Sequence, residues 1–259
     1  MNGLTEKQQD ARQFRLGGSS TPAYLGESPW QSPLTAWRVA MGLEEVTETD
    51  QLVGGNVLED GIAEMAERDL GGIKTYKPDT VYHPTLTDAI AVHFDRLCDE
   101  DSIGIQIKNH HPMMGRIGTS KHQYQGYPTI GEYHNHLVPF HIQMQCQWEM
   151  MVVEAVFGGE WGKKWILASY FGGAKPRIYF ISRDRKIQKP MLKLGMAFWG
   201  KHLDPYGSQE EPIGYYWCKE PKPEVKPVRV TNEGLSAEPV PFATDGKPVS
   251  HNIPFSVEE

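Results

Sequence analysis

The chain has 259 residues, 39% of them hydrophobic, and a net charge of −7. It has enough apolar residues for one large domain. It lacks the run of about 18 apolar residues that a membrane span needs and the apolar stretch of a signal peptide. The acidic balance excludes a protein that coats nucleic acid by bulk charge, although an enzyme with a local basic groove remains possible. Three scattered cysteines exclude a disulfide framework and favour a reducing, cytoplasmic setting.

Glycine, hydroxyl residues and proline follow one another in residues 17–22. This order predicts a loop that leads into a helix, with a hydroxyl at the N-cap and Pro22 at N1, the first helical position. Backbone N–H groups at such a start can receive a phosphate, with Ser19 beside them and Arg12 and Arg15 adding positive charge. An ordinary capped helix also explains this local sequence, and more simply.

Two helices are expected before the middle of the chain. The first covers residues 34–42, and the second opens at Gly54-Gly55 and covers residues 56–70. In the second helix, apolar residues recur at helical spacing and predict a buried stripe: Val57, Leu58, Ile62, Met65, Ala66 and Leu70. Glu59 lies beside this stripe in the first turn. The helix dipole alone accounts for a carboxylate there, but the side chain could also project into a cleft.

Residues 89–109 predict a β-hairpin, because two short apolar runs flank the acidic turn Asp99-Glu100-Asp101. The first run ends at Asp95. The second carries Gln106 and Lys108, which share one face of a strand because side chains alternate along it. The hairpin would therefore bring together a carboxylate, an amide and an ammonium group, which together could hold a hard cation and a water.

The second half of the chain predicts a helix over residues 140–155, strands at 165–171 and 177–182, and a last helix over 187–202. In the first of these helices, positions 140, 144, 148, 151 and 155 form a core stripe and Gln145 points away from it. This order of elements predicts an α/β fold with a central mixed sheet flanked by helices.

Composition changes after residue 203, because nine of the 19 prolines fall in residues 203–259. We therefore expect a domain at 1–203 and a proline-rich, acidic extension at 204–259. Such an extension can be partly disordered or can dock a partner.

Five short motifs in order resemble the YqaJ-type viral recombinase family, which includes lambda exonuclease and belongs to the RecB-like PD-(D/E)xK nucleases. The resemblance covers about residues 10–200. The motifs are the loop from Gly17 to the segment that begins Leu25-Gly26; Gly55-x-x-x-Glu59; His93-Phe-Asp95-Arg-Leu; Ile105-Gln106-Ile-Lys108; and Met144-Gln145-Cys-Gln147-Trp. The resemblance implies a restriction-endonuclease-like core with a central mixed sheet.

This resemblance also implies roles for individual residues. Glu59, Asp95, Gln106 and the backbone carbonyl of Ile107 would hold Mg²⁺, or Mn²⁺ in its place. Lys108 would orient the attacking water or stabilise developing charge. Gln145 would position a metal water or a phosphate. The DNA phosphate contacts would come from Arg12, Arg15, Ser19 and Gln147.

The function implied is a Mg²⁺-dependent DNA exonuclease that works 5′ to 3′ on duplex ends and serves phage-type recombination or DNA repair. Its setting would be the cytoplasm of a bacterium or a phage-infected cell. A single-strand annealing protein is the implied partner, and a ring-shaped homotrimer around DNA is the implied assembly. No membrane partner is expected.

Two departures from the family pattern affect this prediction. Gln106 stands where the family usually has a carboxylate, which predicts weaker metal binding and retuned activity. Asp95 lacks the usual Ser-Pro-Asp-Gly context, and Asp99 and Asp101 lie nearby. A structure-specific endonuclease of the same superfamily and a weakened DNA-binding module are therefore alternatives.

Histidines suggest a third alternative, a metallohydrolase or oxygenase with a zinc or iron site. The candidate ligands are His110, His111, His134, His136 and His141. Their segment is rich in glycine and proline and shows no clear strand alternation, which favours loop structure or DNA contact instead.

Overall fold

The computed structural model describes residues 13–45, 50–110, 138–173 and 175–212. The chain divides into two compact units, Met1–Lys222 and Pro223–Glu259, and all described residues belong to the first. Most of the proline-rich extension lies outside the described residues, so its predicted boundary at 203/204 stays a prediction. Within the described ranges, none of the helices combines the length and the apolar composition that a bilayer span requires.

A four-stranded mixed sheet forms the centre of the first unit. Its spatial order is β3 (Arg96–Cys98), β4 (Ile103–Asn109), β5 (Lys164–Tyr170) and β6 (Arg177–Ser182). The outer pairs are antiparallel and the central pair β4–β5 is parallel. Parallel neighbours require a crossover connection, and here helix α6 (Phe140–Phe157) lies in it. A second small sheet pairs β1 (Val81–Tyr82) with β2 (Ala91–Val92).

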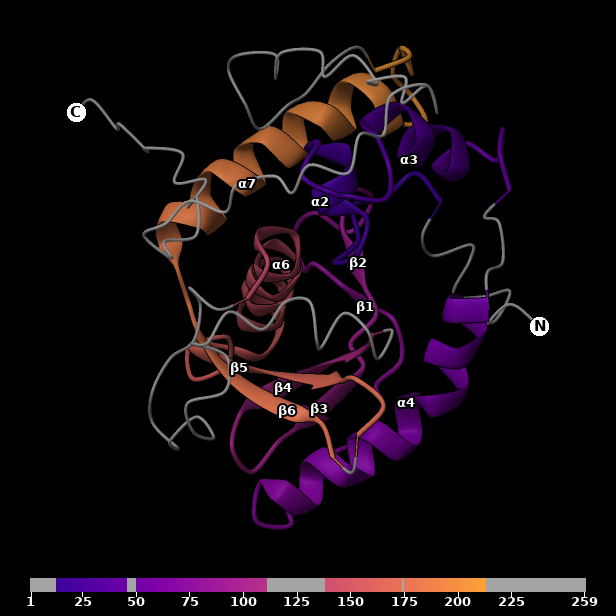
Figure 1. Cartoon of the computed structure of the whole chain (residues 1–259). Coiled ribbons are helices and arrows are strands. Elements are labelled where there is room, and N and C mark those ends of the chain that lie inside the picture. Colours follow the sequence, from indigo (N-terminus) through magenta and orange to yellow (C-terminus); the bar gives the residue numbers. More distant parts are fainter. Residues whose placement is uncertain (1–12, 46–49, 111–137, 174, 213–259) are drawn as a thin grey trace, which may run out of the picture. The chain divides into compact units, whose positions relative to one another are not determined.

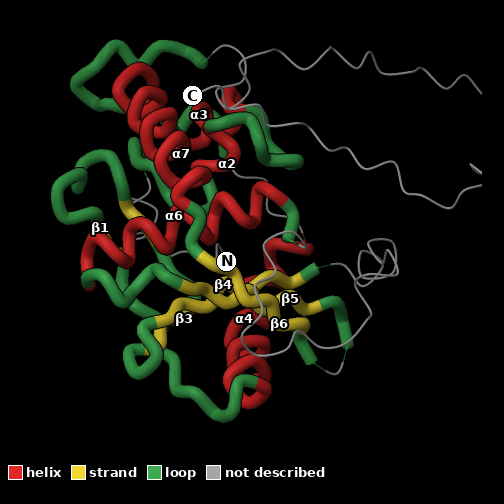
Figure 2. The backbone as a smooth tube through the Cα atoms, turned by 90° about the vertical axis from the view of Figure 1, so that its left-hand side faces the viewer, coloured by secondary structure: helices red, strands yellow, loops and turns green. Residues whose placement is uncertain are grey.

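Helices cover both faces of the four-stranded sheet (Figure 1). Helix α4 (Asp50–Asp69) packs on one face against β4 and β5, and α6 packs on the other. Helix α7 (Arg185–Phe198) and the short α2 (Thr21–Tyr24) pack on α6 (Figure 2). The remaining helical segments, which contact each other, are α3 (Pro33–Ala40) and the π-helical turn Trp199–Leu203.

Strand β4 serves two different layers because its side chains alternate. Ile103, Ile105 and Ile107 join the apolar cluster that includes Ile62 of α4. Residues 104, 106 and 108 therefore face the α6 side of the sheet. On that face the indole of Trp165 covers the space above its neighbour in the parallel ladder, Gly104, where any Cβ would overlap the ring.

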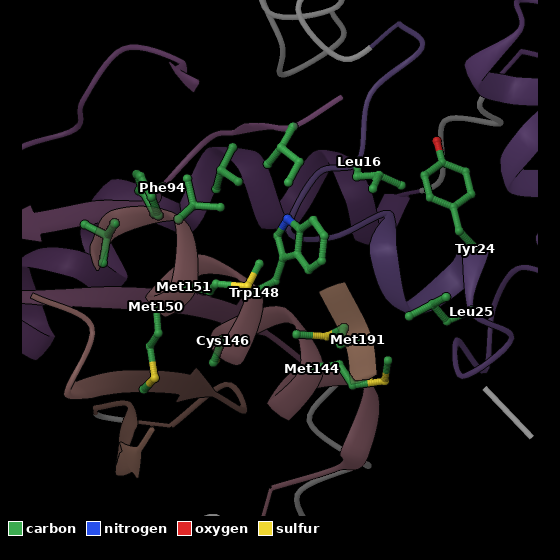
Figure 3. Packing of buried hydrophobic residues seen from close by; sticks show 14 of the residues in the cluster. Leu16, Tyr24, Leu25, Phe94, Met144, Cys146, Trp148, Met150, Met151 and Met191 are labelled. Carbon is green, nitrogen blue, oxygen red and sulfur yellow. The ribbon is translucent and has the colours of Figure 1, made fainter. Parts of the chain in front are cut away.

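The main hydrophobic core lies between the sheet, α6 and α7, around Trp148 (Figure 3). A Cβ at Gly195 of α7 would lie 3.3 Å from both Leu16 Cδ1 and Trp148 Cη2, so the helix–helix contact is close. Every residue from Met144 to Val153 is buried. Helix α6 is thus buried on all sides here, rather than along the single predicted stripe, because further helices cover its second face.

Helix α4 differs from the sequence prediction in where it begins. It starts at Asp50 and runs through Gly54 and Gly55 instead of opening at them. Ile62 and Ala66 are buried as predicted, but Val57 is 73% exposed and Leu58 is 43% exposed. The part of α4 that carries Val57 and Leu58 therefore extends past the sheet (Figure 1), and these two side chains do not belong to the buried stripe.

The other predicted elements are found close to their expected bounds. The hairpin turn at 99–101 joins β3 to β4, with Ser102 at a positive φ of 49° and its N–H donating to the Asp99 carbonyl. The pair predicted at 165–171 and 177–182 forms β5 and β6. Helix α7 begins at an Asp184 cap whose side chain accepts the N–H of Lys186. The predicted α/β fold with a mixed sheet flanked by helices is confirmed.

Candidate active site

Asp95 lies at the start of β3 rather than at the end of a strand. The apolar run 89–95 divides, because Ala91 and Val92 pair with β1, and only Arg96 begins the hairpin ladder. Arg96 pairs with Ile105, so continuing the ladder by one step places Asp95 opposite Gln106. Asp95 and Gln106 therefore lie close together, as predicted, although the first strand of the hairpin begins later than expected.

A chain of hydrogen bonds connects Asp95 to helix α6. The Gln106 amide nitrogen donates to Asp95 Oδ2, and Gln106 Oε1 accepts from Gln145 Nε2 at 2.8 Å. Gln145 Nε2 also donates to Glu149 Oε1 at 2.9 Å. Gln106, Gln145 and Glu149 are all buried, being 2%, 8% and 1% exposed. Strand β4 and helix α6 thus share one enclosed polar cluster.

The charge of Asp95 is poorly solvated in this position. Its pKa is raised to about 6, mainly by burial and also by the nearby Glu59, although Lys108 and the hydrogen bond from the Ile107 N–H oppose the shift. That hydrogen bond is 2.7 Å long. Burial also raises the pKa of Glu149, to about 8, with a second contribution from Asp95. The cluster therefore binds protons at a pH at which exposed carboxyls have lost them.

Lys108 lies on the same face of β4 as Gln106 and is half-buried. Its charge lowers the pKa of Asp95, Glu149, His110 and His141, so these groups lie within electrostatic reach of it. Burial is the first cause of the shifts of both histidines, and the pKa of His110 falls to about 4. Both imidazoles are therefore neutral at pH 7, and Lys108 carries the positive charge of this group.

His110 follows β4 and has a fixed position. Its ring stacks on Phe171 with centroids 4.6 Å apart, and its backbone N–H donates to the Tyr170 carbonyl. His111, His134 and His136, the other predicted ligands of a histidine metal site, lie outside the described residues. Across the described ranges, no group of three or more His, Cys, Asp or Glu side chains is placed to hold a metal ion.

Glu59 lies near Asp95 but is engaged by two cations. Its Oε1 accepts from Lys77 Nζ at 2.6 Å and from Arg96 at 3.3 Å. Arg96 is 8% exposed and also pairs with Asp60. These bonds fix the Glu59 side chain beside β3. Its carboxylate is within electrostatic reach of Asp95, as predicted, but it is neutralised locally.

The N-terminal loop lies against the Glu149 carboxyl. A Cβ at Gly18 would lie 2.6 Å from Glu149 Oε1, so the Gly18 backbone approaches this carboxyl closely and a larger residue would displace the Glu149 side chain. Ser19 follows and is exposed. Arg15 donates to the Thr87 carbonyl and lies over the Tyr82 ring. The residue at the observed N-cap of α2 is Ser20, whose hydroxyl does not bond to the first turn of the helix and instead accepts the Gly17 N–H. Arg12, a further predicted phosphate contact, lies outside the described residues.

Gln147 is separate from the polar cluster. It is fully buried, and its amide donates to the Ser182 carbonyl and accepts the N–H of Asp184. These bonds connect the end of β6 to α6. The predicted contact between Gln147 and a DNA phosphate receives no support from this arrangement.

The donor types of the cluster fit a hard divalent cation. Such a cation prefers carboxylate, amide and carbonyl oxygens, which Asp95, Gln106 and the Ile107 backbone provide. The Gln106 amide nitrogen donates to Asp95 Oδ2 and also lies 3.3 Å from the Ile107 carbonyl oxygen. An N–H donor therefore satisfies two oxygens that were predicted as metal ligands.

The sequence-based prediction missed three residues of this region. Glu149 follows Gln145 by one helical turn, a spacing that places two side chains on the same side of a helix, and this spacing was a usable signal. Lys77 and Arg96 neutralise Glu59, and Lys77 reaches it from a turn-rich segment 18 positions along the chain. Nothing in the local sequence indicates that contact.

Comparisons with known proteins agree with the motif order. The model of the YqaJ-like viral recombinase domain matches residues 8–156. The alkaline exonuclease LHK-Exo of Laribacter hongkongensis has a similar structure, with a TM-score of 0.52 and 17% sequence identity, covering 75% of this chain and 90% of that chain. The structure of LHK-Exo in complex with dAMP gives a TM-score of 0.53 at 16% identity with the same coverage.

A search of curated protein sequences found no match to this chain. The family model covers more than half of the 259 residues, including Glu59, Asp95, Gln106, Lys108 and Gln145. The two LHK-Exo structures are similar to this chain in fold, a mixed sheet between helices. This chain belongs to the family of the YqaJ-like viral recombinase domain.

Proposed function

We propose that this protein is a deoxyribonuclease that degrades linear duplex DNA from its ends and so produces single strands for phage-type recombination or DNA repair. The enzyme class follows from the family and the fold. The observation that best supports a working site is the cluster in which Asp95 accepts from Gln106 and Gln106 accepts from Gln145, with Lys108 on the same strand face.

A divalent cation is the expected cofactor, with Mg²⁺ preferred and Mn²⁺ able to replace it. When bound, such a cation polarises a phosphate and makes a water more acidic. Asp95 and the Ile107 carbonyl supply oxygen atoms on one side of the site, whereas the Gln106 oxygen accepts from Gln145. Glu59 contributes negative charge from α4, although Lys77 and Arg96 hold its carboxylate.

Lys108 is the residue that acts on the attacking water. Its ammonium group lies among Asp95, Glu149 and two neutral histidines. A positive charge there can orient the water and stabilise the charge that develops on the phosphate. Because both imidazoles are uncharged at pH 7, removing Lys108 leaves no other cation of this group in place.

The N-terminal loop would take the phosphate next to the cleaved bond. Ser19 is exposed and follows Gly18, whose backbone lies against the polar cluster. Arg15 lies at the same loop, and Arg12 is the second arginine proposed for this contact. Backbone N–H groups, a hydroxyl and guanidinium groups together suit the non-bridging oxygens of a phosphate.

Polarity and assembly are proposals that rest on the family. We propose digestion from 5′ to 3′, a homotrimer that encircles DNA, and a single-strand annealing protein as partner, all within the cytoplasm of a bacterium or a phage-infected cell. End-labelled duplexes test the polarity, and sedimentation analysis of the full chain tests the assembly.

The main experiment compares linear and closed circular duplex DNA in Mg²⁺ and in Mn²⁺. Wild type should degrade only the linear form, and EDTA should stop the reaction. Lys108→Ala should lose about 100-fold or more in rate. Lys193→Ala, which removes an exposed lysine from α7, is the matched control and should retain wild-type activity.

Three outcomes would contradict this proposal. Absence of cleavage with either metal would exclude the nuclease activity. Cleavage of closed circles would indicate an endonuclease of the same superfamily. Full activity of Lys108→Ala would exclude the assigned site.

A further inference from the structure

Glu149 is a buried carboxyl group with one unsatisfied oxygen. Glu149 is 1% exposed. Oε1 accepts from Gln145 Nε2, whereas Oε2 has no hydrogen-bond partner within the described part of the chain. The Trp165 indole N–H approaches the Glu149 carboxyl as a donor and lowers its pKa, but it does not reach hydrogen-bond geometry, and both atoms are without a partner within the described residues. Burying such a group without a partner is costly, so its retention needs a reason.

Neither protonation state of Glu149 satisfies Oε2. As a carboxylate it would be an acceptor without a donor, and as a neutral acid it would be a donor without an acceptor. An apolar side chain at this position would avoid the cost, since most of α6 is apolar here. A bound cation, or water held by one, would satisfy the oxygen in its charged form.

The position of Glu149 places it at the centre of the proposed site. Gln145 connects it to Gln106 on β4. Its carboxyl also lies against the Gly18 backbone in the loop proposed to hold a phosphate. Lys108 and Asp95 both act on it electrostatically. The carboxyl thus lies within one connected region that includes the strand, the loop and the helix.

Gln106 leaves a gap in the ligand set that Glu149 can fill. Its amide nitrogen, not its oxygen, is directed at Asp95 Oδ2 and the Ile107 carbonyl. Its oxygen is directed at Gln145. Position 106 therefore supplies neither a negative charge nor an oxygen to the space beside Asp95, and Glu149 is the next carboxyl along the same hydrogen-bond chain.

We propose that Glu149 supplies, from helix α6, the carboxylate that strand position 106 lacks, and that it binds the divalent cation with Asp95 either directly or through a water. This inference rests on the proposed metal-dependent function. It assigns a ligand role to a residue outside the motifs that indicated the site.

The test measures Mn²⁺ binding to the full chain without DNA, by calorimetry and by the electron paramagnetic resonance of free Mn²⁺. Glu149→Gln removes the charge but keeps an oxygen that can accept from Gln145. We expect its Mn²⁺ affinity to fall about 10-fold or more, which corresponds to about 1.4 kcal/mol. Glu160→Gln removes an exposed carboxylate and should bind Mn²⁺ like wild type.

A double variant tests the ligand role further by moving the negative charge from position 149 to position 106. The double variant Gln106→Glu/Glu149→Gln returns the carboxylate to the strand, and its Mn²⁺ affinity should recover to within about threefold of wild type. Because Gln106→Glu adds a carboxylate in either case, the double variant is also compared with Gln106→Glu alone. A ligand role of Glu149 predicts weaker Mn²⁺ binding in the double variant, and a purely structural role predicts equal binding. Melting temperatures in EDTA and in Mn²⁺ separate the two roles further, because a ligand changes the increment that Mn²⁺ produces.

The outcomes distinguish this inference from the proposed function. If wild type binds no Mn²⁺, the metal dependence and this inference both fail. If wild type binds Mn²⁺ and Glu149→Gln binds it equally well, only the role of Glu149 fails. Should Glu149→Gln not fold, Glu149→Asp keeps the charge but withdraws it by one methylene, and unchanged Mn²⁺ affinity in that variant would overturn the inference.

Discussion

The backbone N–H of Ile107 donates to Asp95 Oδ2 across 2.7 Å, so this hydrogen bond holds Asp95, which directly precedes β3, against strand β4. The same oxygen accepts from the Gln106 side chain. One carboxylate oxygen therefore both closes the open end of the hairpin and faces the polar cluster. A structural role and a chemical role for Asp95 can be separated by an isosteric substitution.

Asp95→Asn should abolish activity while preserving the fold. The asparagine oxygen can still accept from Ile107 and Gln106, but the charge is lost. We expect the rate of linear DNA degradation to fall by about 100-fold or more. The melting temperature in EDTA at pH 8 should equal or exceed that of wild type, because the substitution removes a poorly solvated charge. A large loss of stability would instead show that the charge itself supports the hairpin.

The metal-free protein should become less stable as the pH rises from about 7 to 8. Burial raises the pKa of Asp95 to about 6 and that of Glu149 to about 8. Unfolded carboxyls ionise near pH 4, so at these two groups the folded state binds more protons than the unfolded state. The lowered pKa values of His110 and His141 act in the opposite direction, but only below about pH 6.5, where unfolded histidines are protonated. The free energy of unfolding then decreases with increasing pH. Urea denaturation in EDTA at intervals of one pH unit measures the slope.

Glu149→Gln isolates the upper part of that pH dependence. Between about pH 7 and 8 Glu149 is the buried carboxyl that still releases its proton, so the slope of unfolding free energy against pH should flatten there in the variant. Mn²⁺ affinity of wild type should change in the opposite direction and increase with pH, because metal ligands must be deprotonated. An unchanged slope in Glu149→Gln would mean that another group titrates in this range.

Gln106→Glu should weaken the metal-free protein and strengthen metal binding. A glutamate cannot donate to Asp95, so two carboxylates would face each other without a hydrogen between them. We expect a lower melting temperature in EDTA at pH 8, and a larger increase on adding Mn²⁺ than wild type shows. Equal increments in both proteins would indicate that position 106 does not contact the metal site.

Gly104→Ala should destabilise the sheet without touching the polar cluster directly. A Cβ there would overlap the Trp165 ring, and crowding of a packed core typically costs about 1–3 kcal/mol. Gly61→Ala is the matched control, because Gly61 is an exposed residue of α4 with open space at its Cβ position. It should stabilise by about 0.5–1 kcal/mol. Chemical denaturation of both variants measures the difference.

Local patterns predicted the parts of this fold whose causes are local. An acidic turn between two apolar runs was sufficient for the β3–β4 hairpin, and alternation correctly placed Gln106 and Lys108 on one face. The start of α4 was wrong because Gly54 and Gly55 resemble a break, while the observed helix continues through them. The pairing of Val81 with Val92 was missed because two-residue strands leave almost no periodic signal.

The candidate site was predictable where its residues stand in short motifs, and less so where contacts span the chain. Asp95, Gln106 and Gln145 are joined by hydrogen bonds as the motif order suggested. The neutralisation of Glu59 by Lys77 and Arg96 depends on how three segments pack together. Burial of Glu149 likewise depends on α6 being enclosed on all sides, which helical periodicity alone did not indicate.

The alternation along β4 makes the site sensitive to the length of the hairpin. Deleting one residue between the turn and Ile105 would exchange the two faces of the strand. The isoleucines that contact α4 would then point towards α6, and Lys108 would point into an apolar layer. The proposed site and the core packing therefore depend on the same register of β4, so single side chains of the strand can change while its length cannot.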